Sequence, residues 1–269
     1  MLVNKSHAIA SRSFKQEPKI NSMQDLLVKD ELQKRDLNTK NLERAFFQST
    51  QLQQVYPFIT SVAKSTFRFS GDRGGTGVLV SEHGHIMTCS HIANRIISTT
   101  DREQESIFFS TGEHFSLRNS SVVFNPEVPD IAVIKVPQLS GRDYLKISKA
   151  DPVVSQRTLL IGYPGCMNGV QVISIGNIKK INHYVEGDGE CFGASFPVFK
   201  NTCLAAHGHS GGPVVDEFGQ LLGIHCRGTW NWYEDPAKWF KKGTLFSYAV
   251  QFDLDLMGRL HDIKELELL

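Results

Sequence analysis

Gly208-His209-Ser210-Gly211-Gly212-Pro213 is the most informative segment of this chain. Glycines on both sides of a serine allow a tight turn that exposes the hydroxyl, and a hydroxyl that attacks a carbonyl group needs that room. When the hydroxyl attacks, the carbonyl oxygen of the attacked group becomes negatively charged, and backbone N–H groups in such a turn can donate hydrogen bonds to it. We expect Gly208 and Ser210 to supply these N–H groups. Taken alone, the segment also fits a glycine-rich turn before a strand.

A second segment begins at Gly75-Thr76-Gly77 and reaches His91. Apolar residues on both sides of a turn at residues 81–85 predict two strands, with His91 where the second strand ends. A serine hydroxyl is a poor nucleophile until a base accepts its proton, and imidazole, with an ordinary pKa of about 6.5, titrates near neutral pH. His91 is therefore the candidate base.

A third segment, Pro129-Asp130-Ile131-Ala132-Val133-Ile134, begins with a carboxylate at the start of an apolar strand. A carboxylate beside an imidazole holds the ring in one tautomer and stabilises its protonated form. Asp130 is the candidate for this role.

In the order histidine, aspartate, serine, these motifs resemble the trypsin/chymotrypsin-fold serine peptidases, and within them the HtrA-like and glutamyl-endopeptidase-like branches. The shared patterns are G-T-G-x-x-V, T-x-x-H, D-[IL]-A-[VL], G-x-S-G-[GS]-P and a G-Y-P stretch at residues 162–165. The resemblance covers about residues 57–262. It implies a serine endopeptidase that hydrolyses proteins or peptides through an acyl-enzyme, with His91, Asp130 and Ser210 as the triad and Gly208 and Ser210 as the oxyanion hole.

The same resemblance implies an all-β, chymotrypsin-like fold of two antiparallel six-stranded β-barrels with the active site between them. The expected parts are a helical N-terminal extension (1–55), a first barrel (56–137), a connector (138–152), a second barrel (153–252) and a C-terminal helix (253–269). The extension also fits a removable pro-segment, a partner-binding arm or a targeting signal. Only residues 214–269 follow Pro213, so we expect no PDZ domain after the peptidase part, in contrast to typical HtrA proteins.

The resemblance also predicts a primary specificity pocket. Its expected lining residues are Leu204, Ala205, His225, Cys226, Arg227, Gly228 and Phe246. His225 matches the pocket histidine of glutamyl endopeptidases and viral 3C-like proteases, where an imidazole N–H donates to a substrate carboxylate or amide. We therefore expect a preference for Glu or Gln before the scissile bond. The alternative is a core histidine with its hydrogen bonds satisfied inside the protein.

Two departures from the resembled family limit this expectation. A threonine or serine usually helps the pocket histidine, but the matching stretch here is Ala205-Ala206-His207, so His207 or Arg227 would have to supply the second contact. Without such a second polar contact, we expect the pocket to favour medium-sized apolar residues. Trypsins also carry an aspartate directly before the serine for zymogen activation, whereas this chain has His209, which cannot act as that carboxylate.

Composition is typical of a globular protein, because the 269 residues are 41% hydrophobic and 21% charged and carry a net charge of +1. Nothing in it indicates binding to nucleic acid or to a membrane. No apolar run reaches the roughly 18 residues of a membrane helix, and no signal-peptide core is visible. We therefore expect a cytoplasmic location, although an unusual secretion or transit signal in residues 1–20 also fits. Composition does not predict the oligomeric state.

The five cysteines are Cys89, Cys166, Cys191, Cys203 and Cys226, an odd number without the spacing of a secreted disulfide scaffold. Free thiols in a reducing compartment are the simplest interpretation.

Metal binding is a second interpretation of the histidines and cysteines that are close in sequence. The two candidate sets are His83, His85, Cys89 and His91, and Cys203, His207 and His209. Neither set has typical ligand spacing, and turns, strand faces and the triad explain their members. We therefore expect no metal site and no organic cofactor.

Two other functions remain open. A catalytically silent binding scaffold would keep the fold but usually loses a triad member, and here all three are present. An enzyme dedicated to one target, which the N-terminal arm recruits, is the other alternative.

Overall fold

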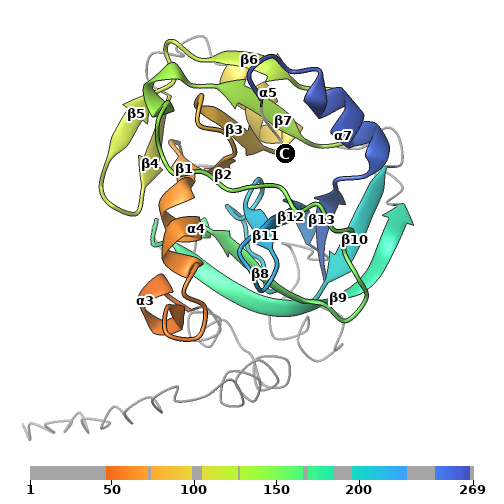
Figure 1. Ribbon diagram of the computed structural model, residues 1–269. Coiled ribbons are helices and arrows are strands. Elements are labelled where there is room, and N and C mark those ends of the chain that lie inside the picture. Colours follow the sequence, from red (N-terminus) through yellow and green to blue (C-terminus); the bar gives the residue numbers. More distant parts are fainter. Residues whose placement is uncertain are drawn as a thin grey trace, which may run out of the picture.

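The computed structural model describes residues 47–71, 74–98, 105–126, 128–165, 169–184, 196–228 and 246–266. Within these ranges the regular structure consists mainly of antiparallel strands in two sheets, with a few short helices around them (Figure 1). The prediction of an all-β protein is confirmed. The predicted helical extension falls mostly on residues 1–46, which lie outside the described residues.

The first sheet has seven strands, one more than we predicted. They are β1 (Thr66–Phe69), β2 (Thr76–Leu79), β3 (His85–Thr88), β4 (Ser106–Phe109), β5 (His114–Ser116), β6 (Ser121–Phe124) and β7 (Ala132–Lys135). Their order is β5-β4-β1-β2-β3-β7-β6, so β5 and β6 are the outermost strands, and no pairing among the described residues closes the sheet. Strands β5 and β6 alternate between exposed and half-buried residues, whereas β2 and β3 are buried throughout, as expected when only the middle of the sheet is covered on both faces.

The second sheet is a closed barrel of six strands, as predicted. Its strands are β8 (Arg157–Gly162), β9 (Val172–Tyr184), β10 (Pro197–Asn201), β11 (Pro213–Val215), β12 (Leu221–Gly228) and β13 (Ser247–Gln251). They follow one another around the barrel in the order β10-β13-β12-β11-β8-β9, with every pair antiparallel.

Strand β8 shows how both sheets share one core. Leu159 and Ile161 point to one face and join the large cluster that also contains the apolar residues of the first sheet. Leu160 lies between them in sequence, points to the opposite face, and packs in a smaller cluster with Phe199 and Val214. Because successive side chains of a strand alternate, a run that is apolar at every position fits a strand buried on both faces.

Short helices lie at the ends of the sheets. They are α3 (Ser49–Leu52), α4 (Ile59–Ser65), α5 (Ser90–Ser98), the 3₁₀ turn η2 (Pro137–Leu139) and α7 (Leu254–His261). Our expectation of strands from Tyr56 onward was wrong for α4, whose buried Ile59, Val62 and Ala63 have helical spacing, and the first strand begins only at Thr66.

The predicted C-terminal helix is present but shorter. Helix α7 starts at an Asp253 cap that accepts a hydrogen bond from the Leu256 N–H, and it ends at His261. Leu256 and Leu260, one turn apart, are its buried residues, and a single apolar stripe of this length anchors about two turns of helix. At the other end of the described chain, the Phe47 backbone pairs with Ile173 of β9.

Candidate active site

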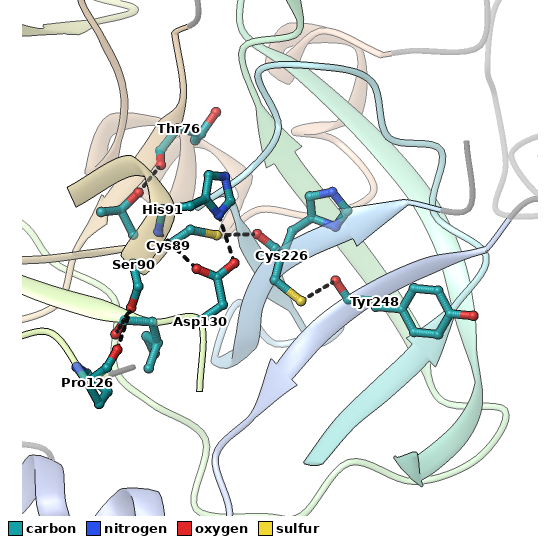
Figure 2. A network of polar contacts seen from close by, with 11 residues as sticks. Thr76, Cys89, Ser90, His91, Pro126, Asp130, Cys226 and Tyr248 are labelled. Atoms are coloured by element: carbon teal, nitrogen blue, oxygen red, sulfur yellow. Dashed lines mark hydrogen bonds and ion pairs between the residues drawn. The ribbon is translucent and has the colours of Figure 1, made fainter. Parts of the chain in front are cut away.

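His91 and Asp130 form a tight pair next to strands β3 and β7 of the first sheet (Figure 2). His91 Nδ1 lies 2.8 Å from Asp130 Oδ2, and the His91 backbone N–H donates to Asp130 Oδ1 at 3.0 Å. The Asp130 side chain is only 3% exposed, while the His91 side chain is 33% exposed. The carboxylate therefore fixes both the ring and the backbone of a histidine that solvent still reaches.

Strand register explains how these two residues meet. Strands β3 and β7 are antiparallel, and Thr88 at the end of β3 lies opposite Ala132 at the start of β7. His91 follows Thr88 in the first turn of α5, and Asp130 precedes Ala132. We predicted His91 at the end of a strand, but the chain instead turns into a helix at Ser90, whose hydroxyl donates to the Ile131 carbonyl at 2.8 Å.

The segment around Ser210 presents two unoccupied backbone donors. The N–H groups of His209, Gly211 and Gly212 donate to the carbonyl oxygens of Ala206, His225 and His209 at 2.8–3.0 Å. Among the described residues, the N–H groups of Gly208 and Ser210 have no acceptor. They belong to the two residues that the sequence suggested as an oxyanion hole, and that role stays a prediction.

The backbone at Gly208 has a conformation that requires glycine. Its φ is +100°, and a Cβ at this position would collide with the Tyr163 carbonyl oxygen. The Gly165 N–H donates to the His207 carbonyl at 2.8 Å. Because the C=O and N–H of one trans peptide point in opposite directions, this bond turns the Gly208 N–H away from Gly165.

Thr76, in strand β2 of the first sheet, connects that sheet to the serine segment. Its hydroxyl donates to the Gly208 carbonyl at 2.7 Å and accepts from the Tyr163 N–H at 3.1 Å. Its own N–H donates to the Ser210 carbonyl at 2.8 Å. In the sequence Thr76 is only one member of a G-T-G motif, and its contacts with the serine segment form only when the two sheets come together.

The Ser210 hydroxyl is the third group of the triad that the sequence predicts. Ser210 is half-buried, and its hydroxyl has no hydrogen-bond partner among the described residues, His91 included.

His225 is buried in β12, with 3% exposure. Its Nδ1 lies 2.8 Å from the Ser247 hydroxyl, and its ring packs edge-on against His209 with centroids 6.4 Å apart. Burial, followed by the neighbouring His209 and His91, lowers the pKa of His225 to about 3. A neutral imidazole whose Nδ1 faces Ser247 leaves Nε2 for a second partner.

The other predicted pocket residues differ in exposure. Leu204, Ala205 and Cys226 are buried, whereas Arg227, Gly228 and Phe246 are half-buried. His207, which we considered as a second contact for substrate, is exposed.

The His209 side chain packs within the segment that carries Ser210 and against Gly162. Its Nδ1 accepts from the Ala206 N–H at 3.0 Å, and its ring lies so close to Gly162 that a Cβ there would be 2.7 Å from His209 Cδ2. Burial lowers its pKa to about 4. The ring is therefore a neutral support of the serine segment, in agreement with our expectation that it does not act as a carboxylate.

Two thiols lie near the Asp130 carboxylate. Cys89 Sγ donates to the His225 carbonyl at 3.1 Å, and Cys226 Sγ donates to the Tyr248 carbonyl at 3.4 Å (Figure 2). Burial, followed by the charge of Asp130, raises the pKa of both thiols well above the ordinary value. A thiol that resists ionisation reacts slowly with oxidants.

Comparison with known proteins identifies the family. Residues 75–224 match the trypsin-like peptidase domain, and the chain belongs to this family. It is 28% identical over 152 residues to the serine endoprotease DegS of Salmonella typhimurium, a match that covers 56% of this chain and 38% of that protein. It is 26% identical over 157 residues to the serine protease PepD of Mycobacterium tuberculosis, covering 56% of this chain and 33% of that one. The chain therefore spans less than half the length of these relatives.

Solved structures confirm the chymotrypsin-like fold. A protease from M. tuberculosis, crystallised in its active form, superposes with a TM-score of 0.60 at 18% identity and covers 79% of this chain and 86% of that one. The serine endoprotease from Yersinia pestis gives a TM-score of 0.54 at 18% identity, covering 80% and 66%. No helix among the described residues is long and apolar enough to span a membrane.

Proposed function

We propose that this chain is a serine endopeptidase in which His91 accepts the Ser210 proton, Asp130 orients the imidazole, and the N–H groups of Gly208 and Ser210 stabilise the oxyanion. The pair of free N–H donors beside Ser210 is the observation that supports this most directly. Buried donors are normally paired, so two free ones at a reactive serine indicate a ligand with a negative oxygen.

The chemistry proceeds in two stages. Ser210 Oγ attacks the substrate carbonyl while its proton moves to His91 Nε2, and the Asp130 carboxylate, 2.8 Å from Nδ1, stabilises the imidazolium. The imidazolium then protonates the leaving amine, and an acyl-enzyme on Ser210 remains. Water, activated by the same imidazole, releases the acid product and restores the serine.

We further propose a preference for Glu or Gln before the scissile bond. The Ser247 hydroxyl, 2.8 Å from His225 Nδ1, supports this, because the contact occupies one ring nitrogen and leaves Nε2 for a substrate carboxylate or amide. The pocket that we propose also includes Leu204 and Ala205, which are buried and apolar, and an apolar substrate side chain in it would leave the His225 imidazole unpaired. Medium-sized apolar residues remain the alternative.

Digestion of a diverse peptide library tests both parts. The wild-type protein should cut after Glu or Gln, and Ser210→Ala should abolish every cut. Asp130→Asn should keep the fold and reduce kcat on the order of 10⁴-fold. Cuts after apolar residues would support the peptidase activity but reject the proposed preference for Glu or Gln at His225. A complete lack of Ser210-dependent cuts would favour the alternative of a catalytically silent binding scaffold.

The remaining predictions from the sequence are part of this proposal. They are the five-part division of the chain at residues 55, 137, 152 and 252, a protein or peptide as partner, and a cytoplasmic location. An enzyme whose single target is recruited by residues 1–55 would lose that target, but retain cleavage of short peptides, when these residues are deleted.

A further inference from the structure

We propose that Cys89, His91 and Asp130 form a binding site for a thiophilic divalent cation, Zn²⁺ above all, and that the bound ion blocks the triad. Ligand atoms of the three residues, a thiol sulfur, an imidazole nitrogen and a carboxylate oxygen, all lie within 4.8 Å of one another. The inhibitory part of this inference rests on the proposed function, while the binding part does not.

The ligand set suits zinc. Zn²⁺ binds thiolate sulfur at about 2.3 Å and imidazole nitrogen or carboxylate oxygen at about 2.0–2.2 Å, usually with four ligands in a tetrahedron. Ligand atoms of such a site lie on the order of 3.5 Å apart. All three atoms lie within 4.8 Å of one another, and His91 Nδ1 is 2.8 Å from Asp130 Oδ2, so the thiol would approach the ion while the imidazole and the carboxylate separate slightly around it. Water from the side of the partly exposed His91 ring would supply the fourth ligand.

The thiol is what distinguishes this place from an ordinary histidine–aspartate pair. Cys89 is fully buried, and its neighbours are the carboxylate of Asp130 and the carbonyl of His225 (Figure 2). A thiolate and a carboxylate side by side in a buried site repel each other strongly, and a divalent cation between them gives a neutral centre. The site therefore favours a doubly charged cation with affinity for sulfur over Mg²⁺ or Ca²⁺, which bind oxygen ligands.

Metal binding and catalysis require different proton positions on His91. As a base, His91 keeps its proton on Nδ1, hydrogen-bonded to Asp130, and accepts the serine proton on Nε2. When the ion binds Nδ1, that proton moves to Nε2, and Nε2 no longer accepts. The Cys89 S–H bond breaks as the Zn–S bond forms, so one proton leaves the protein for each ion bound, and no electron is transferred.

Cobalt binding by the full-length Ser210→Ala protein tests the site without any proteolysis. Co²⁺ bound to a thiolate has a sulfur-to-metal charge-transfer band in the near ultraviolet, so titration of the apo protein should give this band with one ion per chain. Zn²⁺ should displace it, because zinc binds such ligands more tightly than cobalt. Cys89→Ala in the same background should lose the band and weaken Zn²⁺ binding by more than about 100-fold.

Cys203→Ala is the matched control, because Cys203 is also a buried thiol but contacts Thr158 in the second barrel. It should keep the band, and circular dichroism should show that both variants are folded. A band that persists in Cys89→Ala, or no band in Ser210→Ala at millimolar Co²⁺, would overturn the site. With the protein that retains Ser210, Zn²⁺ should inhibit peptide cleavage. The cleavage rate of Cys89→Ala, compared with the rate of the same variant without zinc, should not change when Zn²⁺ is added. Zn²⁺ binding without inhibition would reject the proposal that the ion blocks the triad.

Discussion

The Thr76 hydroxyl of the first sheet donates to the Gly208 carbonyl of the second at 2.7 Å, and the Thr76 N–H donates to the Ser210 carbonyl at 2.8 Å. One residue therefore contacts both amino acids whose N–H groups we assign to the oxyanion hole. Thr76 is fully buried, so water cannot replace these bonds when they are removed.

We expect Thr76→Val to reduce kcat by about 10- to 100-fold, because the loss of one or two buried hydrogen bonds, worth about 1–3 kcal/mol, releases the Gly208 peptide. KM should change little, since Thr76 does not contact substrate in this assignment. Thr76→Ser, which keeps the hydroxyl, should restore most of the rate. Steady-state kinetics on a short peptide, together with thermal unfolding, separates this from a loss of folded protein. Equal kcat for Val and Ser variants would reject the positioning role.

Gly208→Ala should decrease kcat by about 100- to 1000-fold, the effect of losing one oxyanion donor. The physical reason is the φ of +100° and the collision of a Cβ with the Tyr163 carbonyl oxygen, which together force the peptide to rotate. Gly112→Ala is a suitable control, because Gly112 has a φ of +89° but open space around its Cβ position. If both substitutions reduce kcat equally, backbone strain, and not the loss of the Gly208 N–H donor, would explain the effect.

His225→Ala should reduce the ratio of cleavage after Glu to cleavage after Leu by about 10- to 100-fold, the effect of one hydrogen bond to a charged or polar group. Ser247→Ala should reduce it less, since Ser247 only contacts the far nitrogen, Nδ1, at 2.8 Å. Competition between two peptides that differ at this single position gives the ratio directly. An unchanged ratio in both variants would leave His225 as a core residue.

Stability should fall as the pH decreases from about 6.5 towards 4. Burial lowers the pKa of His209 to about 4 and that of His225 to about 3. In this range the unfolded chain, with ordinary histidines near 6.5, binds more protons than the folded chain, and the linkage relation then requires stability to rise with pH.

Urea unfolding at several pH values measures the slope of the free energy of unfolding against pH. His209→Gln should flatten it, because the substitution removes a group that only the unfolded state protonates. His114→Gln, at an exposed position, is the control and should not flatten it. His225→Gln provides an independent check, and equal slopes in all four proteins would contradict the prediction.

Much of the site followed from local sequence. The positive φ at Gly208 and the strand that follows Asp130 are properties of a few neighbouring residues. Backbone conformation at a glycine and alternation along a strand depend on near neighbours, so they can be inferred from a short segment.

Other features depend on residues that are far apart in the chain. Helix α4 was missed because its buried apolar residues, Ile59, Val62 and Ala63, were interpreted as part of a strand region. The number of strands in the first sheet depends on which segments pair with strands β4 and β7.

Proximity of Cys89 to Asp130 was also not predicted, because our metal hypothesis grouped Cys89 with His83, His85 and His91, its neighbours in sequence, and left Asp130 out. In the structure His85 instead contacts Ser81, with its Nδ1 2.7 Å from that hydroxyl.

The sequence by itself determined the class of fold and the glycine turn that carries Ser210, and it predicted His91, Asp130 and Ser210 as the triad from their order in the chain. Only the tertiary structure decided that Thr76 holds this turn from the other sheet and that two thiols lie near the Asp130 carboxylate. The physical reason is that local motifs constrain the backbone within a few residues, whereas strand pairing and core packing bring together side chains that no short segment contains.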